Sequence, residues 1–183
     1  MYNYNTDVET IGAGVGAFAA GMVIFVIIIA LIALAVAVLA IIAKWKMYVK
    51  AGQPGWKAIV PFYNTWTECQ IVGITSWWVV AILLLSVLSM IPYIGFIFSL
   101  AEFAASIYFA IVLHVSMARA YGHPDGFAAG YIFLSVIFFC ITGFGKAKYV
   151  GSNRPMSDPI GEWMDKFLVS HNFKSGINRQ EAK

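Results

Sequence analysis

The side chains that could carry chemistry are few and far apart. Glu102 is the one carboxylate in an apolar run over 93–118, and His114 follows it by twelve residues. At 3.6 residues per turn, that spacing places the two side chains about 120° apart on a helix, so they do not share a face. A charge at the centre of a membrane costs at least about 2.5 kcal/mol. Glu102 is therefore either a proton- or cation-binding group or a hydrogen-bonded carboxylate near a membrane surface, and His114 is interpreted as an interfacial or hydrogen-bonded histidine.

No recognised catalytic set accompanies these residues in the sequence. His123 and Asp125 could form an acid–base pair, but the Gly-His-Pro-Asp-Gly segment that contains them is more simply a turn. The two cysteines, Cys69 and Cys140, lie far apart, and no Cys-x-x-Cys or His-Glu-x-x-His pattern is present. We therefore expect no catalytic residue, no metal, no cofactor and no enzymatic activity.

The composition indicates what kind of element must position these side chains. Of 183 residues, 61% are hydrophobic and 11% are charged, whereas soluble domains carry about 25% charged residues. The net charge of +3 is too small for a nucleic-acid-binding surface. These values exclude a soluble enzyme and a nucleic-acid-binding module, and they predict an integral membrane protein.

Four apolar runs cover 11–43, 71–91, 93–118 and 127–144. The first could reach roughly 50 Å as a helix, more than the roughly 30 Å of a hydrocarbon core, so we place its spanning part at 20–43. It lacks a basic segment before it and is read as an uncleaved anchor. The runs predict an all-α bundle of about four transmembrane helices, because backbone polar groups in lipid must bond within a helix.

The chain divides into three predicted parts. An anchor helix with a Gly-rich start covers 1–43, a membrane domain with an interfacial segment at 51–70 covers 44–150, and a polar tail covers 151–183. In the tail, Asp158 could cap an amphipathic helix near 159–169. Apolar residues recur there at helical spacing and predict a face for a bilayer surface or a partner protein: Ile160, Trp163, Met164, Phe167 and Leu168.

The basic residues near the ends of the runs predict orientation. They are Lys44, Lys46, Lys50, Lys57, Arg119, Lys146, Lys148 and Arg154. Four complete crossings with the N-terminus outside put five of them inside the cell and three outside. If the fourth run turns back without crossing, all eight lie inside. Either arrangement predicts a multi-pass protein of the cell (inner) membrane with its N-terminus outside, and the side of the C-terminus stays open.

Small residues recur every four positions at the start of the anchor, at Gly12, Gly16 and Ala20. Such a series lets two helices approach closely in lipid. It predicts a packing face with another membrane protein or a second copy, although any Ala/Gly-rich helix produces such a series by chance.

Several short stretches carry a family resemblance. They are 50–56 with Pro54, Gly55 and Trp56; 59–64 with Pro61, Tyr63 and Asn64; 118–122; and 143–149 with Gly143 and Gly145. Together they resemble an uncharacterised family of small prokaryotic multispanning membrane proteins, over about 44–151. The resemblance implies a compact helical membrane domain, sometimes fused to or neighbouring a signal peptidase, without an assigned activity. Ser116 stands where the family has an acidic residue, and Ser135 and Cys140 stand where it has prolines.

The residues of these stretches suit structural roles. Pro54–Gly55 predicts a turn with a positive φ at the glycine that returns Trp56 to the membrane surface, and Asn64 could cap the next turn. Gly143 and Gly145 would let the chain leave the membrane tightly.

Three functions remain open from the sequence. The first is a non-enzymatic scaffold or accessory subunit that contacts lipid and other membrane subunits, or itself, and no nucleic acid. The second is a small ion or solute transporter or channel that uses Glu102. The third is a sensor of anionic lipid that uses the lysines of 44–57 and the tail helix.

Overall fold

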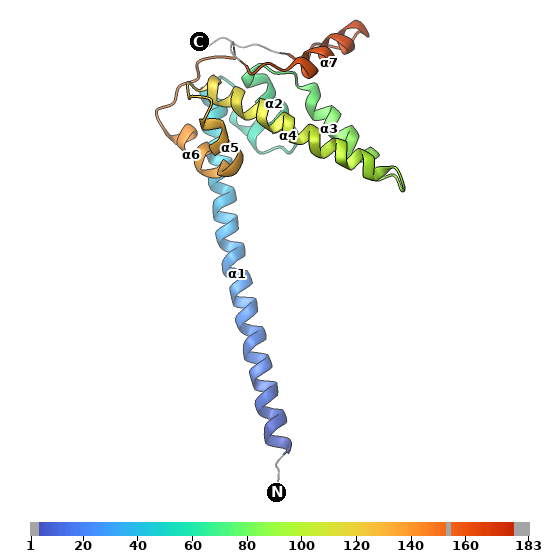
Figure 1. The fold of residues 1–183 in the computed structure, drawn as a ribbon. Coiled ribbons are helices and arrows are strands. Elements are labelled where there is room, and N and C mark those ends of the chain that lie inside the picture. The colour runs from blue at the N-terminus through green and yellow to red at the C-terminus, as the bar shows by residue number, and fades with distance from the viewer. Residues whose placement is uncertain (1–3, 153–154, 178–183) are drawn as a thin grey trace. The chain divides into compact units, whose positions relative to one another are not determined.

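The computed structural model describes the backbone of residues 4–152 and 155–177 and the side-chain surroundings of these residues from Gly14 onward. All regular elements of the described residues are helical (Figure 1). The prediction of an all-α protein is confirmed. The chain forms two compact units, Met1–Leu39 and Ala40–Lys183, which are described separately here as unit 1 and unit 2.

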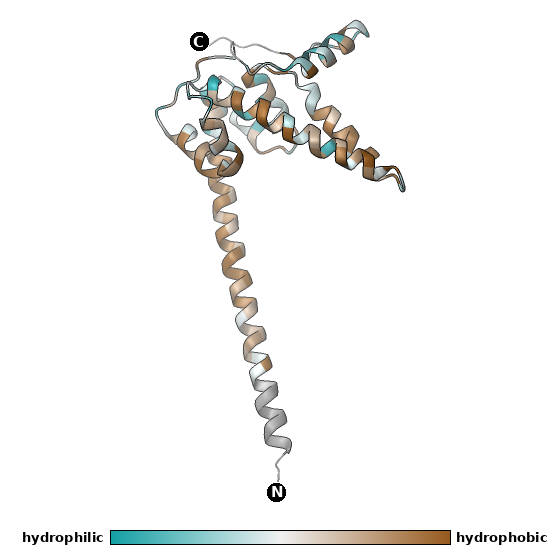
Figure 2. Cartoon of the chain, viewed as in Figure 1, coloured by the Kyte–Doolittle hydropathy of each residue, from teal (hydrophilic) through white to brown (hydrophobic). Residues whose placement is uncertain are grey.

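Unit 1 consists of the greater part of helix α1, Tyr4–Lys50. From Gly14 to Leu39 its side chains are exposed, and the hydropathy colouring shows a long apolar band (Figure 2). Two helices of the described residues are long and apolar enough to cross a membrane, α1 over Gly14–Lys50 and α4, Gly95–Ala120. The expectation of a membrane protein therefore has the support of two such helices.

Unit 2 begins with the last turns of α1, where Ala43, Met47 and Tyr48 are buried. A 3₁₀ helix, Gly55–Ala58, and helix α2, Tyr63–Val72, follow. The core of unit 2 joins these residues to apolar side chains of α2, of α4 and the residue after it, of α5, Phe127–Phe133, and of α6, Ser135–Phe144: Cys69, Ile71, Val112, Met117, Tyr121, Tyr131 and Phe139.

The apolar run predicted over 71–91 is divided between two helices. Helix α2 ends at Gly73, which has a φ of 77°, and α3, Trp77–Leu88, begins four residues later. A left-handed conformation favours glycine. A Cβ at this position would also lie 2.7 Å from the carbonyl oxygen of Ser152. The prediction of one continuous helix over 71–91 is wrong because this glycine ends α2 inside the run.

Helices α3 and α4 form an antiparallel hairpin around Pro92 (Figure 1). At 1.5 Å per residue, α3 is about 18 Å long and α4 about 39 Å. The indole of Trp78 packs against the rings of Tyr108 and Phe109 and fixes the register of the pair.

The run over 127–144 forms two helices, α5, Phe127–Phe133, and α6, Ser135–Phe144. The break lies at Leu134, whose φ and ψ of −128° and 44° are not helical. The ring of Phe138 packs directly on Gly130, where a Cβ would clash with it. Residues eight apart on one straight helix are about 12 Å apart along its axis, so this contact requires α5 and α6 to fold back on one another. The prediction of one helix over 127–144 is wrong for that reason.

The tail carries helix α7, Pro159–Ser170. Asp158 accepts a hydrogen bond from the backbone N–H of Gly161, and Pro159 occupies the first turn. Asp158 caps the N-terminus, and proline suits the first turn because it needs no amide donor.

Candidate functional site

An ion pair between a half-buried lysine and a buried carboxylate joins the end of α1 to α2. Lys44 Nζ lies 2.8 Å from Glu68 Oε1, and the two side chains are 22% and 6% exposed. The Tyr48 hydroxyl donates to the carbonyl oxygen of Asn64 at 2.8 Å and lies 3.3 Å from the same Glu68 oxygen. The sequence reasoning missed Glu68, because a lone carboxylate in a polar segment gives no signal that a lysine 24 positions earlier will face it.

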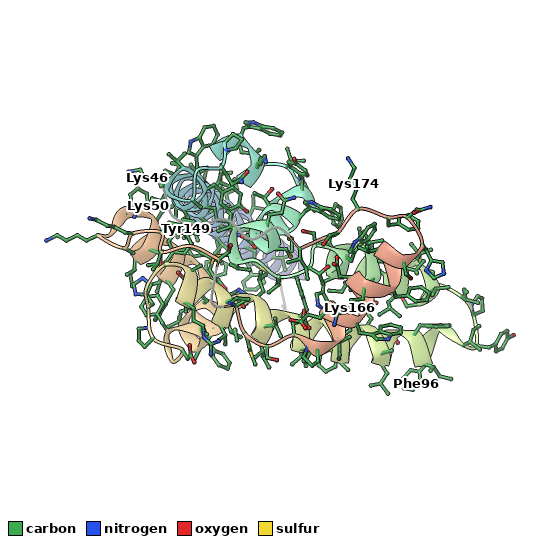
Figure 3. All side chains as sticks on the ribbon, turned by 90° about the horizontal axis from the view of Figure 1, so that it is seen from above. Lys46, Lys50, Phe96, Tyr149, Lys166 and Lys174 are labelled. Atoms are coloured by element: carbon green, nitrogen blue, oxygen red, sulfur yellow. The ribbon has the colours of Figure 1, made fainter. Side chains whose placement is uncertain are left out.

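The second contact at the end of α1 involves Lys50. Its Nζ donates to the carbonyl oxygens of Thr142 and Gly145, at 2.7 and 2.9 Å. These carbonyls lie at the C-terminus of α6, where backbone oxygens lack helical partners and the helix dipole favours a cation. Gly143 permits the approach, since a Cβ there would lie 2.5 Å from the carbonyl oxygen of Ala43. Figure 3 shows Lys50 at this end of α1.

The C-terminus of α4 meets the same region. The Tyr121 hydroxyl donates to the carbonyl oxygen of Met47 at 2.7 Å, and the Val150 N–H donates to that of Ala120 at 2.8 Å. Burial raises the pKa of Tyr121 well above its ordinary value, so this donor keeps its proton. We call the meeting point of the ends of α1, α4 and α6 with α2 the junction.

Glu102 lies apart from the junction, in the α3–α4 hairpin. It is half-buried and accepts a hydrogen bond from Ser86 Oγ at 2.7 Å. Of the two interpretations of this residue, that contact supports the hydrogen-bonded carboxylate. His114 Nδ1 lies 2.6 Å from the carbonyl oxygen of Ala110, and its ring is near Tyr131. Glu102 and His114 are twelve positions apart in α4, about 18 Å along the helix axis, so they form no common site.

His123 and Asp125 contact different partners. Arg119 Nε and Nη2 each donate to one carboxylate oxygen of Asp125 at 2.7 Å. That bidentate contact lowers the pKa of Asp125. The His123 ring instead stacks on Phe127, with centroids 4.0 Å apart. Burial, together with the charge of Lys50, lowers the pKa of His123. Among the described residues, no group of three His, Cys, Asp or Glu side chains could hold a metal ion.

The residues of the 54–64 loop make contacts within the chain. Gly55 lies in the 3₁₀ helix, and its missing side chain makes room for the indole of Trp45. The expected positive φ at Gly55 is wrong, since positive φ angles occur instead at Gly52 and Phe62. Trp56 is exposed and stacks on Tyr63, with centroids 5.8 Å apart.

Pro61 and Asn64 lie where this loop enters α2. The carbonyl oxygen of Pro61 accepts from the Tyr63 N–H at 2.6 Å, where the chain turns into α2. Asn64 lies inside α2, and its side chain accepts from Thr65 Oγ1. The expected cap by Asn64 is therefore wrong. Gly145 follows α6 directly, and its N–H donates to the carbonyl oxygen of Ile141 at 2.8 Å.

The small residues of the anchor lie on α1. Gly16 and Ala20 are exposed, and a Cβ at Gly16 would meet nothing within 4 Å. Gly12 lies outside the residues whose side-chain surroundings the structure describes. The face at Gly16 and Ala20 thus has free space in front of it in unit 1.

The apolar residues of α7 divide into two groups. Met164 packs against the core of unit 2, and Leu168 is half-buried. Ile160, Trp163 and Phe167 are exposed, and the rings of Trp163 and Phe167 stack at 5.7 Å. The latter three are called the α7 stripe below.

Comparison with known proteins identifies one family. A family model described as a family of unknown function (DUF5684) matches residues 56–152, just over half of the chain. The predicted membership of an uncharacterised family is therefore confirmed. No curated protein and no solved structure matches the chain. The matched region contains Glu68 and Glu102 and ends before α7.

Proposed function

The chain belongs to the family of unknown function DUF5684, and from that premise we propose that it is a non-enzymatic, multi-pass membrane protein that acts as a scaffold or accessory subunit of a larger membrane complex. One observation carries the proposal. Charged side chains of the described residues fix one apolar helix to another, as Lys44 does with Glu68 and Lys50 with the end of α6. Such contacts suit a rigid body that offers surfaces to other proteins.

The way the fourth apolar run folds favours one orientation in the membrane. The start of α5 follows the end of α4, and the end of α6 is bound by Lys50, so both ends of the run approach the junction. The two arms are about 10 and 15 Å long, too short for a hydrocarbon core of roughly 30 Å. Helix α3, at about 18 Å, would cross such a core only together with the apolar residues that flank it in the 71–91 run. We infer that α5 and α6 form a re-entrant hairpin, with the N-terminus outside and all eight basic residues inside the cell.

Cysteine labelling tests this orientation. Lys57→Cys and Lys148→Cys are introduced separately into a chain with Cys69→Ala and Cys140→Ala, in oriented membrane vesicles. A membrane-impermeant maleimide should label both positions from the cytoplasmic side. Labelling of the two positions from opposite sides would instead support four complete crossings.

The scaffold proposal itself is tested by the size of the particle that carries the protein. The membrane is extracted with a lipid-preserving polymer, and the mass of the particle is compared with that of the monomer. We expect a complex of defined composition, either with other subunits or with further copies. A monodisperse monomer without a second protein would contradict the proposal.

A transporter or channel is the second candidate, because Glu102 is a half-buried carboxylate in an apolar helix long enough to cross a membrane. Its hydrogen bond to Ser86 favours a structural role. Ion and proton flux into liposomes with the wild-type protein and with Glu102→Gln separates the two. A flux that is abolished by the substitution supports transport, and an equal flux removes Glu102 from any transport mechanism.

A further inference from the structure

Helix α7 is attached to the rest of unit 2 through polar side chains. Asp158 accepts hydrogen bonds from Trp78 Nε1 at 2.7 Å, from the Tyr108 hydroxyl at 3.1 Å and from the Gly161 N–H at 3.0 Å. A buried carboxylate needs such donors because it has lost its water. These bonds tie the start of α7 to both helices of the α3–α4 hairpin.

A second buried carboxylate fixes the rotation of α7. Asp165 accepts from the Gly176 N–H at 2.6 Å and from Ser175 Oγ at 2.8 Å. The segment that follows is held in turn, because the Ser76 N–H donates to the carbonyl oxygen of Gly176 at 3.1 Å. Gly161 lies between the two carboxylates, and a Cβ there would clash with Asp158 and meet Thr75. Helix α7 therefore cannot roll over to bury its other side without breaking these bonds.

This attachment leaves the α7 stripe outside. Ile160, Trp163 and Phe167 are 51%, 65% and 51% exposed. An amphipathic helix of a soluble protein normally turns such residues toward the core. Here the two carboxylates and Met164 occupy the inner side of α7, which leaves the apolar side chains of the α7 stripe available to a surface outside the chain.

The neighbours of α7 indicate what that cover is. Helix α7 packs on α3, which pairs with α4, one of the two helices that can cross a membrane. Phe96 of α4 is 78% exposed and points away from the ribbon (Figure 3). Because α7 and α4 belong to the same folding unit, lipid around α4 would lie close to α7 as well. Tryptophan and phenylalanine suit the membrane–water interface, and the exposed Lys166 can lie at the level of the headgroups.

We propose that α7 is a membrane-surface helix, with Ile160, Trp163 and Phe167 inserted at the boundary between lipid headgroups and acyl chains and with Lys166 at the level of the headgroups. This inference rests on the membrane placement in the proposed function. It adds a lipid-binding surface in the tail, outside the region matched by the family.

Spin-label accessibility in liposomes tests the proposal on the full-length chain. Single cysteines replace Phe167, Glu162 and Phe96 in turn, in the background with Cys69→Ala and Cys140→Ala, and each carries a nitroxide. Glu162 is the matched control, since it is exposed on α7 about 140° from Phe167 around the helix. Oxygen concentrates in lipid and a nickel chelate in water, so their relative collision rates report whether a label lies in lipid.

The expected result is a lipid environment about 5–10 Å deep for Phe167→Cys, lipid also at Phe96→Cys, and water for Glu162→Cys. Water at Phe167→Cys with lipid at Phe96→Cys would overturn this inference and leave the membrane placement intact. Water at both would overturn both. A label at position 167 shielded from oxygen and from nickel would mean that protein covers the stripe, which also overturns the inference.

Discussion

Replacement of Glu68 by glutamine should destabilise unit 2 strongly. The change keeps the shape and an acceptor for the Tyr48 hydroxyl but removes the negative charge opposite Lys44, whose side chain is only 22% exposed. Breaking a buried ion pair by removing one partner costs about 3–5 kcal/mol, because a charge is left buried and unpaired. Lys44 keeps some contact with water, so the lower end, about 3 kcal/mol, is expected. For a chain of this size that is a fall in Tm of about 6–12 °C.

Circular dichroism of the purified protein in detergent measures this change. Asp125→Asn is the control, since it breaks a second ion pair, with Arg119, in which the side chains of Arg119 and Asp125 are 34% and 59% exposed. Water screens an exposed pair, so its loss should lower Tm much less. The double variant Lys44→Met/Glu68→Leu removes both charges and should unfold at a higher temperature than Glu68→Gln. Equal falls in Tm for Glu68→Gln and Asp125→Asn would refute the reasoning.

Three further changes probe other parts of unit 2. Gly130→Ala places a methyl group against the ring of Phe138 and should cost about 1–3 kcal/mol, whereas Gly126→Ala meets nothing within 4 Å and should leave Tm nearly unchanged in the same thermal scans. Burial lowers the pKa of His123, so the neutral ring contributes stability above pH about 6.5, the pKa in the unfolded chain. That contribution is lost as the pH falls. The Tm of His123→Gln should therefore decrease less than the Tm of the wild-type protein when the pH is lowered. Asp158→Ala removes the cap of α7 and should speed cleavage of the tail by trypsin, while an unchanged cleavage rate would mean that this carboxylate does not hold the helix.

The sequence predicts the types of the elements better than their limits. Hydropathy is enough to find α1 and α4, because an apolar helix of this length needs no partner in the chain to be recognised. The breaks at Gly73 and Leu134 escape such reasoning. The first depends on the carbonyl of Ser152, which lies 79 residues away in sequence, and the second on a ring that packs across the fold.

The residues of the candidate site likewise fall into those that local sequence predicts and those that depend on packing between helices. Asp158 and Pro159 follow local rules for a helix start, so the position of α7 can be predicted from a short segment. The partners of Glu68, Lys50 and Glu102 lie on other helices, and only packing decides which polar group faces which. The five-residue apolar pattern of α7 likewise gives no sign that Met164 turns inward.

The last turns of α1 have a practical consequence for dissecting this protein. Ala43, Met47 and Tyr48 precede the family region yet fill the interior of unit 2. A fragment that starts at Trp56 would lack these three side chains, the cation opposite Glu68 and the amine that closes the end of α6. Any excised piece intended for crystals or spectroscopy must therefore start no later than Ala40, in the middle of a helix, since no loop marks the border of this folding unit.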